Sequence, residues 1–564
     1  MLRETPRFAE IAATGADLTI IGAGPVGIIT ALAARDSGLR VLVLESGHKA
    51  EDALLQSHAD DTITTPQTHH DGIHTTARRL GGAGHLWGGR CVPFDPIDFT
   101  ARPWLPGCKE AWPLTPQDLD PWLAPAIRYL GAGDAVFEAP LPPDLARRVQ
   151  GSGPDKELSG FTANRLERWT NDPRVERRFM EQITNDLDLH VALGVSVTGA
   201  EMADGKLTGL HVWTETENTT AALPVGEVIL AAGGIASTRL LLALQAQASS
   251  LFGGPQGALG RHYMGHVNGQ IADIVFDDAA FSESFDYHID GHGSYVRRRM
   301  TPTDALQSQA QLSNVAFWPV VPEIAEATHR SGPLSAVFLG LSMPVLGKRL
   351  IAEAIRRKHI GSPPYRRAAH LRNILTDPAG TLSFVPKFIY QRYVSKNRAP
   401  GFFLRNPGRR YGLEFHAEHL PNPDSRITLD PNRRDRTGLP HASIDFRFTE
   451  ADAAPILRAH DALEEWLETR GLGRLIYRYG QDTPARGIFA EAKHGNHQIG
   501  TIRMSHRRED GVVDTWGTCF DLSNLHVAST AVLRSSSQAN PTLAAVQLAL
   551  RLVDHLKQGR KFHG

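Results

Sequence analysis

The chain has 564 residues, a formal net charge of −1 and 41% hydrophobic residues. This neutral, ordinary composition provides a large core and argues against general binding to nucleic acids. Three cysteines without a CxxC pair argue against a disulfide framework and against a zinc cluster. The first 17 residues lack an apolar stretch of signal-peptide length, so the sequence predicts a soluble, cytoplasmic protein.

Residues 17–45 alternate between a strand, a glycine-rich turn, a helix and a second strand. Gly22, Gly24 and Gly27 form the GxGxxG pattern, in which the glycines allow a tight turn, a close pyrophosphate and close helix packing. Glu45 ends the second strand, where an acid binds ribose hydroxyls. The pattern predicts a dinucleotide site and disfavours NADP, but it does not separate NAD from FAD. The alternative is a glycine-rich turn in another α/β protein.

Further along the chain, residues 187–235 contain short β-like runs, and the last of them leads through a turn into a helix over 237–246. Residues 101–150 are rich in proline and tryptophan, which predicts irregular excursions and short helices. Near the end, Asn540 and Pro541 favour the start of a helix that runs to about Leu556. Asn540 could therefore be only a helix cap.

A basic segment covers residues 348–410, with 15 Lys and Arg residues against Glu353 and Asp377. One interpretation is a solvated face or a mobile lid. The other is a weak contact with an anionic surface, either lipid headgroups or a redox partner.

Four separated blocks resemble the glucose–methanol–choline (GMC) oxidoreductases, which are FAD enzymes. They are the glycine fingerprint and residues 80–93, 228–242 and 497–564; LPNPDSRITL at 420–429 is typical of a subset of the family. The resemblance implies an α/β fold, with a discontinuous Rossmann-like FAD-binding domain and an α+β substrate domain built on an antiparallel sheet. The FAD-binding domain is expected at 1–100, 187–262 and 505–564. The substrate-binding domain is expected at 101–186 and 263–504, with 348–410 as a basic lid or insertion.

The resemblance also implies functional residues. His497 matches the catalytic base, a role suited to an imidazole with a pKa near neutrality, and Asn540 matches its partner. The expected FAD contacts are Gly22, Gly24, Gly27, Glu45, Ala83, Trp87, Gly88, Val197, Ser529, Thr530, Asn540, Pro541 and Thr542. Ser529 and Thr530 stand where the family often has Asp or Gly followed by Ala.

Two further expectations concern the site. Some members bind FAD covalently through a histidine, but the matching position here is Leu86, and His85 precedes it. A one-residue shift in an extended segment turns the side chain away, so noncovalent FAD is expected. His494 and His497 are three residues apart, but no carboxylate lies at metal-ligand spacing, so no metal is expected.

The implied reaction is oxidation of a primary or secondary alcohol to a carbonyl, with hydride transfer to the flavin. The loop and the neighbouring tryptophans favour the pyranose oxidase and sugar dehydrogenase side of the family, and hence a sugar, glycoside or sugar alcohol. Trp87 could stack on a sugar or pack in the core. The alternatives are a hydrophobic alcohol such as a steroid or terpenoid, a lyase reaction on cyanohydrins, and a redox-inactive binding protein. Oxygen, a quinone or a cytochrome could accept the electrons.

Overall fold

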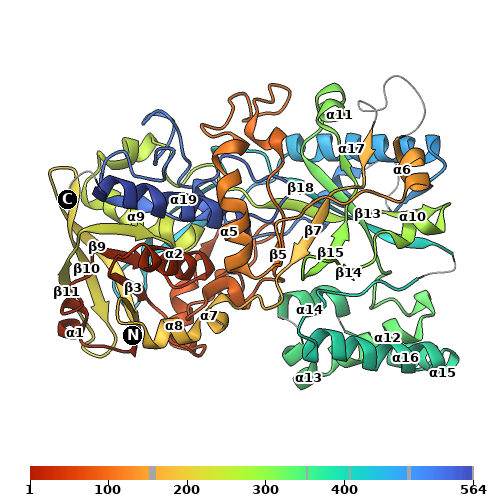
Figure 1. Ribbon diagram of the computed structural model, residues 1–564, viewed down its shortest axis with the longest axis horizontal. Coiled ribbons are helices and arrows are strands. Elements are labelled where there is room, and N and C mark those ends of the chain that lie inside the picture. The colour runs from red at the N-terminus through yellow and green to blue at the C-terminus, as the bar shows by residue number, and fades with distance from the viewer. Residues whose placement is uncertain (151–159, 351–352, 362, 406–407, 479–483, 562–564) are drawn as a thin grey trace.

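The computed structural model describes residues 1–150, 160–350, 353–361, 363–405, 408–478 and 484–561. Two sheet-based halves lie side by side, and a group of helices lies beside the second half, at the lower right of Figure 1.

A six-stranded parallel sheet forms the centre of the first half. Its strands lie in the order β1 (Leu2–Glu4), β8 (Leu189–Leu193), β3 (Val41–Glu45), β2 (Leu18–Ile21), β12 (Glu227–Leu230) and β22 (Leu525–Val527). Every residue of β2 and β3 is buried, as expected for a parallel sheet covered on both faces. The strand, turn, helix and strand predicted over 17–45 are therefore confirmed, with helix α2 at Pro25–Asp36.

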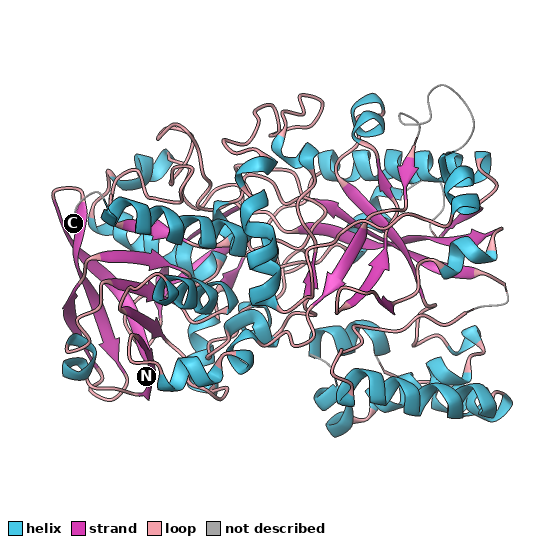
Figure 2. Cartoon of the chain, in the orientation of Figure 1, coloured by secondary structure: helices cyan, strands magenta, loops and turns pink. Residues whose placement is uncertain are grey.

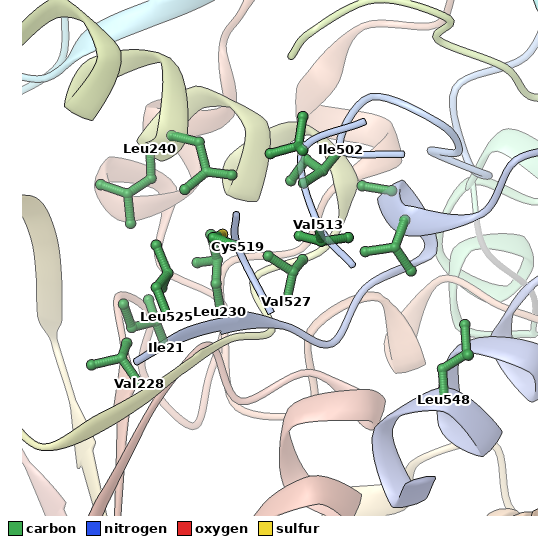
Figure 3. Close-up of a cluster of buried hydrophobic side chains, with 14 of the residues drawn as sticks. Ile21, Val228, Leu230, Leu240, Ile502, Val513, Cys519, Leu525, Val527 and Leu548 are labelled. Atoms are coloured by element: carbon green, nitrogen blue, oxygen red, sulfur yellow. The ribbon is translucent and has the colours of Figure 1, made fainter. Parts of the chain in front are cut away.

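Helices cover one face of this sheet. Helix α2, helix α5 (Asp120–Leu130) and the C-terminal helix α19 (Thr542–Lys561) share one apolar cluster with the sheet. On the other face, helix α9 (Gly234–Gln247) and a three-stranded sheet close a second cluster, part of which is drawn in Figure 3. The strands of that sheet are β11 (Thr219–Pro224), β10 (Lys206–Thr214) and β9 (Val195–Ala203).

The second half contains an antiparallel sheet, as expected. Its strands are β17 (Val315–Val320), β18 (Arg410–Glu418), β13 (His266–Phe276) and β21 (Gly473–Tyr477). Helix α17 (Glu450–Thr469) shares an apolar cluster with this sheet. A smaller antiparallel sheet contains β14 (His288–Ile289), β15 (Tyr295–Arg298), β7 (Leu166–Trp169) and β5 (Arg90–Cys91).

A mostly helical insertion that includes the basic segment lies between β17 and β18. It contains α12 (Gly332–Ser342), α13 (Pro344–Leu350), α14 (Glu353–Ile360), α15 (Arg367–Thr376), α16 (Pro378–Ile389) and the π turn η7 (Tyr390–Val394), of which α12 and the start of α13 precede residue 348. These helices have a small apolar core of their own around Leu334 and Phe338. Among the residues that the structure describes, no helix is both long and apolar enough to cross a membrane.

Short elements connect these parts. They are α1 (Phe8–Ala12), α3 (Ala53–Gln56), η1 (Ser57–Ala59), β4 (Thr62–Ile63), α4 (Gly72–Thr75), η2 (Gly82–His85), η3 (Pro96–Phe99), η4 (Pro116–Asp118), α6 (Pro143–Gln150), β6 (Phe161–Thr162), α7 (Val175–Arg178), α8 (Met180–Asn185), η5 (Leu251–Gln256), α10 (Ala279–Glu283), β16 (Thr301–Pro302), α11 (Asp304–Gln309), η6 (Ala327–His329), β19 (Arg426–Arg434), β20 (Pro440–Asp445), α18 (Pro484–Glu491) and η8 (Thr530–Val532). Several contacts cross the proposed domain division: for example, α5 packs on the parallel-sheet half, β4 pairs with β20, and β5 pairs with β7.

Candidate active site

His497 and Asn540 lie in direct contact, with His497 Nε2 and Asn540 Nδ2 separated by 3.2 Å. The other end of the Asn540 amide accepts a hydrogen bond from Arg90 Nε at 2.5 Å. The side chain of Asn540 therefore joins Arg90 to His497, which is a larger role than capping the helix that begins at Thr542.

These contacts determine which atoms carry the protons. An arginine can only donate, so the atom of Asn540 that faces Arg90 must be the carbonyl oxygen, and the amide nitrogen must face His497. Asn540 therefore donates to His497 Nε2. In a neutral ring, the proton of His497 must then reside on Nδ1.

The contacts on the other side of the His497 ring lead to the same proton assignment. His497 Nδ1 lies 2.8 Å from His266 Nδ1, and His266 Nε2 lies 3.0 Å from the carbonyl oxygen of Ser536 and 3.1 Å from that of Ala539. Because carbonyls only accept, His266 carries its proton on Nε2, and its Nδ1 accepts from His497. Both ends leave the lone pair of His497 Nε2 as the proton acceptor of the site.

The electrostatic environment keeps these rings neutral. Burial lowers the pKa of His497 well below its ordinary value, and repulsion from His266, when that ring is protonated, and from Arg90 lowers it further. Burial also lowers the pKa of His266 well below its ordinary value. Near neutral pH, His497 is therefore available as a base.

The guanidinium of Arg90 contacts one acidic and one aromatic side chain. Its Nη1 lies 3.1 Å from the carboxylate of Glu167, and its guanidinium lies 4.9 Å from the ring centre of Trp318. These contacts hold the guanidinium in place, so that Nε points at Asn540.

His416 completes the group of rings. It stacks on His266 with ring centres 4.2 Å apart, and its Nδ1 donates to the carbonyl oxygen of Gln538 at 2.7 Å.

Sequence reasoning missed His266, His416 and Arg90. Arg90 directly follows two glycines within the block at 80–93, which is a usable signal, whereas His266 and His416 stand where the family resemblance is weak or absent.

The glycine turn fits a dinucleotide. A Cβ on Gly22, whose φ is +107°, would lie 2.7 Å from the carbonyl oxygen of Ala231, and a Cβ on Gly27 would lie 2.0 Å from that of Gly22. In contrast, a Cβ on Gly24 would have no atom within 4 Å. The first and third glycines thus allow the chain to pack, and the second borders open space at the start of α2. Gly24 caps α2 without a side-chain hydrogen bond, so the helix presents backbone N–H groups there.

Glu45 lies at the same turn. Its carboxylate accepts hydrogen bonds from the backbone N–H groups of Ala23 and Gly47, both at 2.8 Å. Burial raises the pKa of Glu45, while these hydrogen bonds act in the opposite direction. Each carboxylate oxygen can accept a further hydrogen bond, which suits a ribose hydroxyl. The turn and its acid together fit the adenosine and pyrophosphate parts of FAD.

The second block lies against this turn. Gly81 donates its backbone N–H to the carbonyl oxygen of Ala23 at 2.9 Å, and a Cβ on Gly82 would lie 2.9 Å from Gly24 Cα. Ala83 and Gly88 are exposed on the same loop. Trp87 is half-buried, packs on the apolar cluster around α2 and donates its indole N–H to the carbonyl oxygen of Pro173 at 2.6 Å. These contacts favour core packing as the role of Trp87.

The remaining predicted contacts lie on three elements. Val197 is half-buried in β9, and Thr542 begins α19. Ser529 Oγ accepts from the backbone N–H of Ala531 at 3.2 Å, and Thr530 Oγ1 donates to the carbonyl oxygen of Gln498 at 2.6 Å. Thr530 thereby connects η8 to the residue that follows His497.

His85 ends the 3-10 helix η2, so the extended segment expected there is wrong, and its ring is held by other groups of the protein. Its Nε2 lies 3.1 Å from the carbonyl oxygen of Leu80 and 3.2 Å from the carboxylate of Glu176.

The histidine group has one property of a metal site, because ligand atoms of His266, His494 and His497 all lie within 4.8 Å of one another. Two nitrogen ligands of a tetrahedral zinc ion are, however, about 3.4 Å apart. The Nδ1 atoms of His266 and His497 are 2.8 Å apart, which is a hydrogen-bond distance. The geometry therefore favours a hydrogen-bonded pair of imidazoles.

Comparisons with known proteins show which families the chain resembles. The model for GMC oxidoreductase matches residues 421–549, and that for FAD dependent oxidoreductase matches residues 17–306. The chain is 24% identical to the 6'''-hydroxyparomomycin C oxidase of Streptomyces lividus over 97% of this chain and 93% of that one. It is 29% identical to the C-glycoside 3-oxidase of Arthrobacter globiformis over 26% of each. Other curated relatives are likewise matched over only 26–27% of their own length.

Among solved structures, pyridoxine 4-oxidase from Mesorbium loti aligns with a TM-score of 0.52 and 17% identity. The alignment covers 96% of this chain and 99% of that one, which supports the fold.

Proposed function

Because this chain belongs to the FAD-dependent oxidoreductases, as a GMC oxidoreductase with FAD as its cofactor, we propose that it oxidises an alcohol carbon of a polyhydroxylated substrate. One observation carries the proposal. His497 and Asn540 are in contact, and the hydrogen bonds on both sides of the His497 ring leave its Nε2 as the acceptor of a proton.

In the proposed reaction, His497 Nε2 accepts the hydroxyl proton of the substrate. Asn540 donates a hydrogen bond from Nδ2 to the same oxygen and so fixes the carbon in one orientation. Bound FAD supplies the acceptor for the hydride that leaves the carbon, so the alcohol becomes a carbonyl. His266 keeps the His497 ring in the productive tautomer, and Arg90 holds the Asn540 amide in the orientation that donates to the substrate.

We further propose that the turn of Gly22, Gly24 and Gly27 binds the pyrophosphate and that Glu45 binds the adenosine ribose. Ala83, Gly88, Val197, Ser529, Thr530 and Thr542 are proposed as further contacts. FAD is proposed to be held without a covalent bond, and the engagement of His85 with Leu80 and Glu176 supports this.

A sugar, a glycoside or a sugar alcohol is the proposed substrate class. It is supported by the loop at 80–93 and by the likeness to a C-glycoside 3-oxidase. A hydrophobic alcohol is the alternative. Oxygen, a quinone or a cytochrome is the proposed electron acceptor, and the cytoplasm is the proposed location.

The test is anaerobic mixing of the FAD-loaded protein with sugars, glycosides, sugar alcohols and hydrophobic alcohols. Bleaching of the oxidised flavin by one of these classes supports the proposal and identifies the class. The variant His497→Ala should bind FAD and stay oxidised, whereas His288→Ala, at an exposed histidine, should be reduced like the wild type. A flavin that no alcohol bleaches, in a protein that cleaves cyanohydrins, would establish the lyase alternative instead.

A further inference from the structure

Exposed apolar side chains are concentrated in one small part of the molecule. Among the described residues, 15 large hydrophobic side chains are exposed, and ten of them lie between residues 343 and 394. This segment is less than a tenth of the chain. Such a cluster of apolar groups on a protein surface marks an interaction site.

Helices α15 and α16 show how these side chains point outward. On α15, His370 and Asn373 are buried and both contact Ser335 on α12, at 3.1 Å each. Leu371 and Leu375, one helical turn apart, are 52% and 78% exposed. The inner face of α15 is therefore held by α12, and its leucines lie on the outer side.

Helix α16 repeats this arrangement. Thr381 is buried against the start of α12, where a Cβ on Gly332 would lie 2.3 Å from Thr381 Oγ1. Leu382 and Ile389, seven residues apart and thus on one face, are 74% and 50% exposed. Figure 1 shows α15 and α16 together along one edge of the molecule, and Figure 2 shows that this edge consists of helices, away from both main sheets.

The segment that carries these two helices is strongly basic. Residues 348–410 contain 15 Lys and Arg residues against Glu353 and Asp377, and Asp377 accepts a hydrogen bond from the backbone N–H of Gly380 at the start of α16. Exposed cations on α15, on α16 and directly before α15 are Arg366, Arg367, Arg372 and Lys387. The outer face thus combines protruding aliphatic side chains with a positive charge.

We propose that α15 and α16 dock the enzyme on an anionic lipid bilayer as a peripheral contact, with the leucines at the acyl boundary and the basic residues against the headgroups. Interfacial helices need both components, because apolar burial and attraction to anionic lipids each contribute to binding. A protein partner is the alternative, and the experiments below distinguish it from a bilayer. Docking of this kind is independent of the flavin chemistry proposed above.

The first experiment uses the FAD-loaded wild type and sedimenting vesicles. Vesicles of phosphatidylcholine with phosphatidylglycerol should bind the protein, and vesicles of phosphatidylcholine alone should bind at least about tenfold less. Salt near 1 M should weaken binding to the anionic vesicles, because it screens the charges. Equal binding to both vesicle types, or no binding to either, would overturn the proposal.

Matched variants locate the surface. Leu375→Ser with Leu382→Ser should reduce the vesicle-bound fraction about tenfold, because two apolar side chains no longer enter the lipid. The control Leu187→Ser, at a leucine that is 72% exposed on the other half, should bind like the wild type. Lys387→Glu should likewise weaken binding about fivefold or more, and Lys206→Glu, at an exposed residue that begins β10, should leave it unchanged. Equal effects of the paired variants would contradict this assignment.

A measurement on the wild type alone avoids any question of folding. Hydrogen exchange of peptides covering 367–394 should slow when anionic vesicles are added, while peptides of α9 should be unaffected. If the protein instead forms dimers that the two serine substitutions dissociate, and vesicles protect no peptide of 367–394, then the face is an interface between copies of the chain. Protection by an added acidic cytochrome but not by vesicles would assign the face to a redox protein, and either result would refute lipid docking.

Discussion

The Nδ1 atoms of His266 and His497 lie 2.8 Å apart, so the two imidazoles share one proton between ring nitrogens. The carbonyl oxygens of Ser536 and Ala539 and the guanidinium of Arg90 determine which ring donates. A residue that was not expected at the site, His266, therefore sets the tautomer of the proposed base.

Replacing His266 tests this relationship. His266→Leu removes the acceptor, so His497 can adopt the wrong tautomer, and we expect kcat for flavin reduction to fall about 100-fold, with little change in KM. His266→Asn places a carbonyl oxygen near the former Nδ1 and should retain most of the activity. Stopped-flow reduction of the FAD-loaded variants measures both. Equal losses in the two variants would indicate a packing role only.

Arg90 is predicted to act through Asn540. Arg90→Lys keeps the charge but loses the Nε donor that holds the Asn540 carbonyl at 2.5 Å. We expect the rate of flavin reduction to fall roughly tenfold while FAD content is unchanged. The double variant Arg90→Lys with Asn540→Ala should be no slower than Asn540→Ala alone, and additive losses would rule out this coupling.

The rate of flavin reduction should decline at a lower pH than it would with a histidine of ordinary pKa. Burial lowers the pKa of His497 well below its ordinary value, so the ring stays unprotonated as the pH falls through about 6.5. We expect kcat/KM for flavin reduction to be level across that range and to decline only at a clearly lower pH. A decline centred at or above 6.5 would mean that the ring is more solvated in the working enzyme.

Stability should also decrease in acid because of buried histidines. The pKa of His460 is lowered by burial to about 4, and its ring packs between Phe317 and Phe415. Between pH 6.5 and 4 the unfolded chain binds a proton at this position and the folded chain does not, so stability is full above 6.5 and is lost as the pH falls. The loss is at most about 3 kcal/mol for a shift of this size.

His460→Leu removes this group without changing the surface. Thermal unfolding followed by calorimetry should show the variant losing less stability than the wild type between pH 7 and 4.5. Comparing the two proteins is necessary because the pKa of Asp98, raised by burial to about 7, contributes in the opposite direction. Parallel pH dependences in the two proteins would disprove a role for His460.

Substitutions of two fingerprint glycines should affect different properties, folding in one case and cofactor binding in the other. Gly27→Ala places a Cβ 2.0 Å from the carbonyl oxygen of Gly22 and should lower Tm by several degrees, whereas Gly24→Ala meets no atom within 4 Å and should fold normally. We expect Gly24→Ala to bind FAD at least about tenfold more weakly, because its methyl group enters the space proposed for the pyrophosphate. Normal FAD affinity in Gly24→Ala would place the pyrophosphate elsewhere.

The sequence was sufficient to predict the parts that short-range patterns encode. The strand, turn and helix at Leu18–Asp36 and the C-terminal helix are written in glycine spacing, capping residues and apolar periodicity, and the structure confirms them. His497 and Asn540 were found through the family resemblance, and the structure brings them together. The cofactor contacts themselves stay predictions.

The missed residues share a physical cause. His266 acts through a contact with a residue 231 positions away, and Arg90 through one 450 positions away. No local pattern encodes such pairs, because only the packing of β13 and β5 against the final loop creates them. The outward leucines of α15 and α16 were missed for a similar reason, since the sequence does not say which face α12 covers.

The order of strands in the parallel sheet has a consequence for how this protein is made. A neighbour of the central strand β2 is β12, and β12 in turn needs β22, which is formed by Leu525–Val527. During synthesis, that edge of β12 stays unpaired until Leu525–Val527 has been made, long after β12 itself. Nascent chains that stall before residue 525 would expose a hydrophobic strand edge, so we expect biogenesis to depend on chaperones more than the finished enzyme's stability suggests.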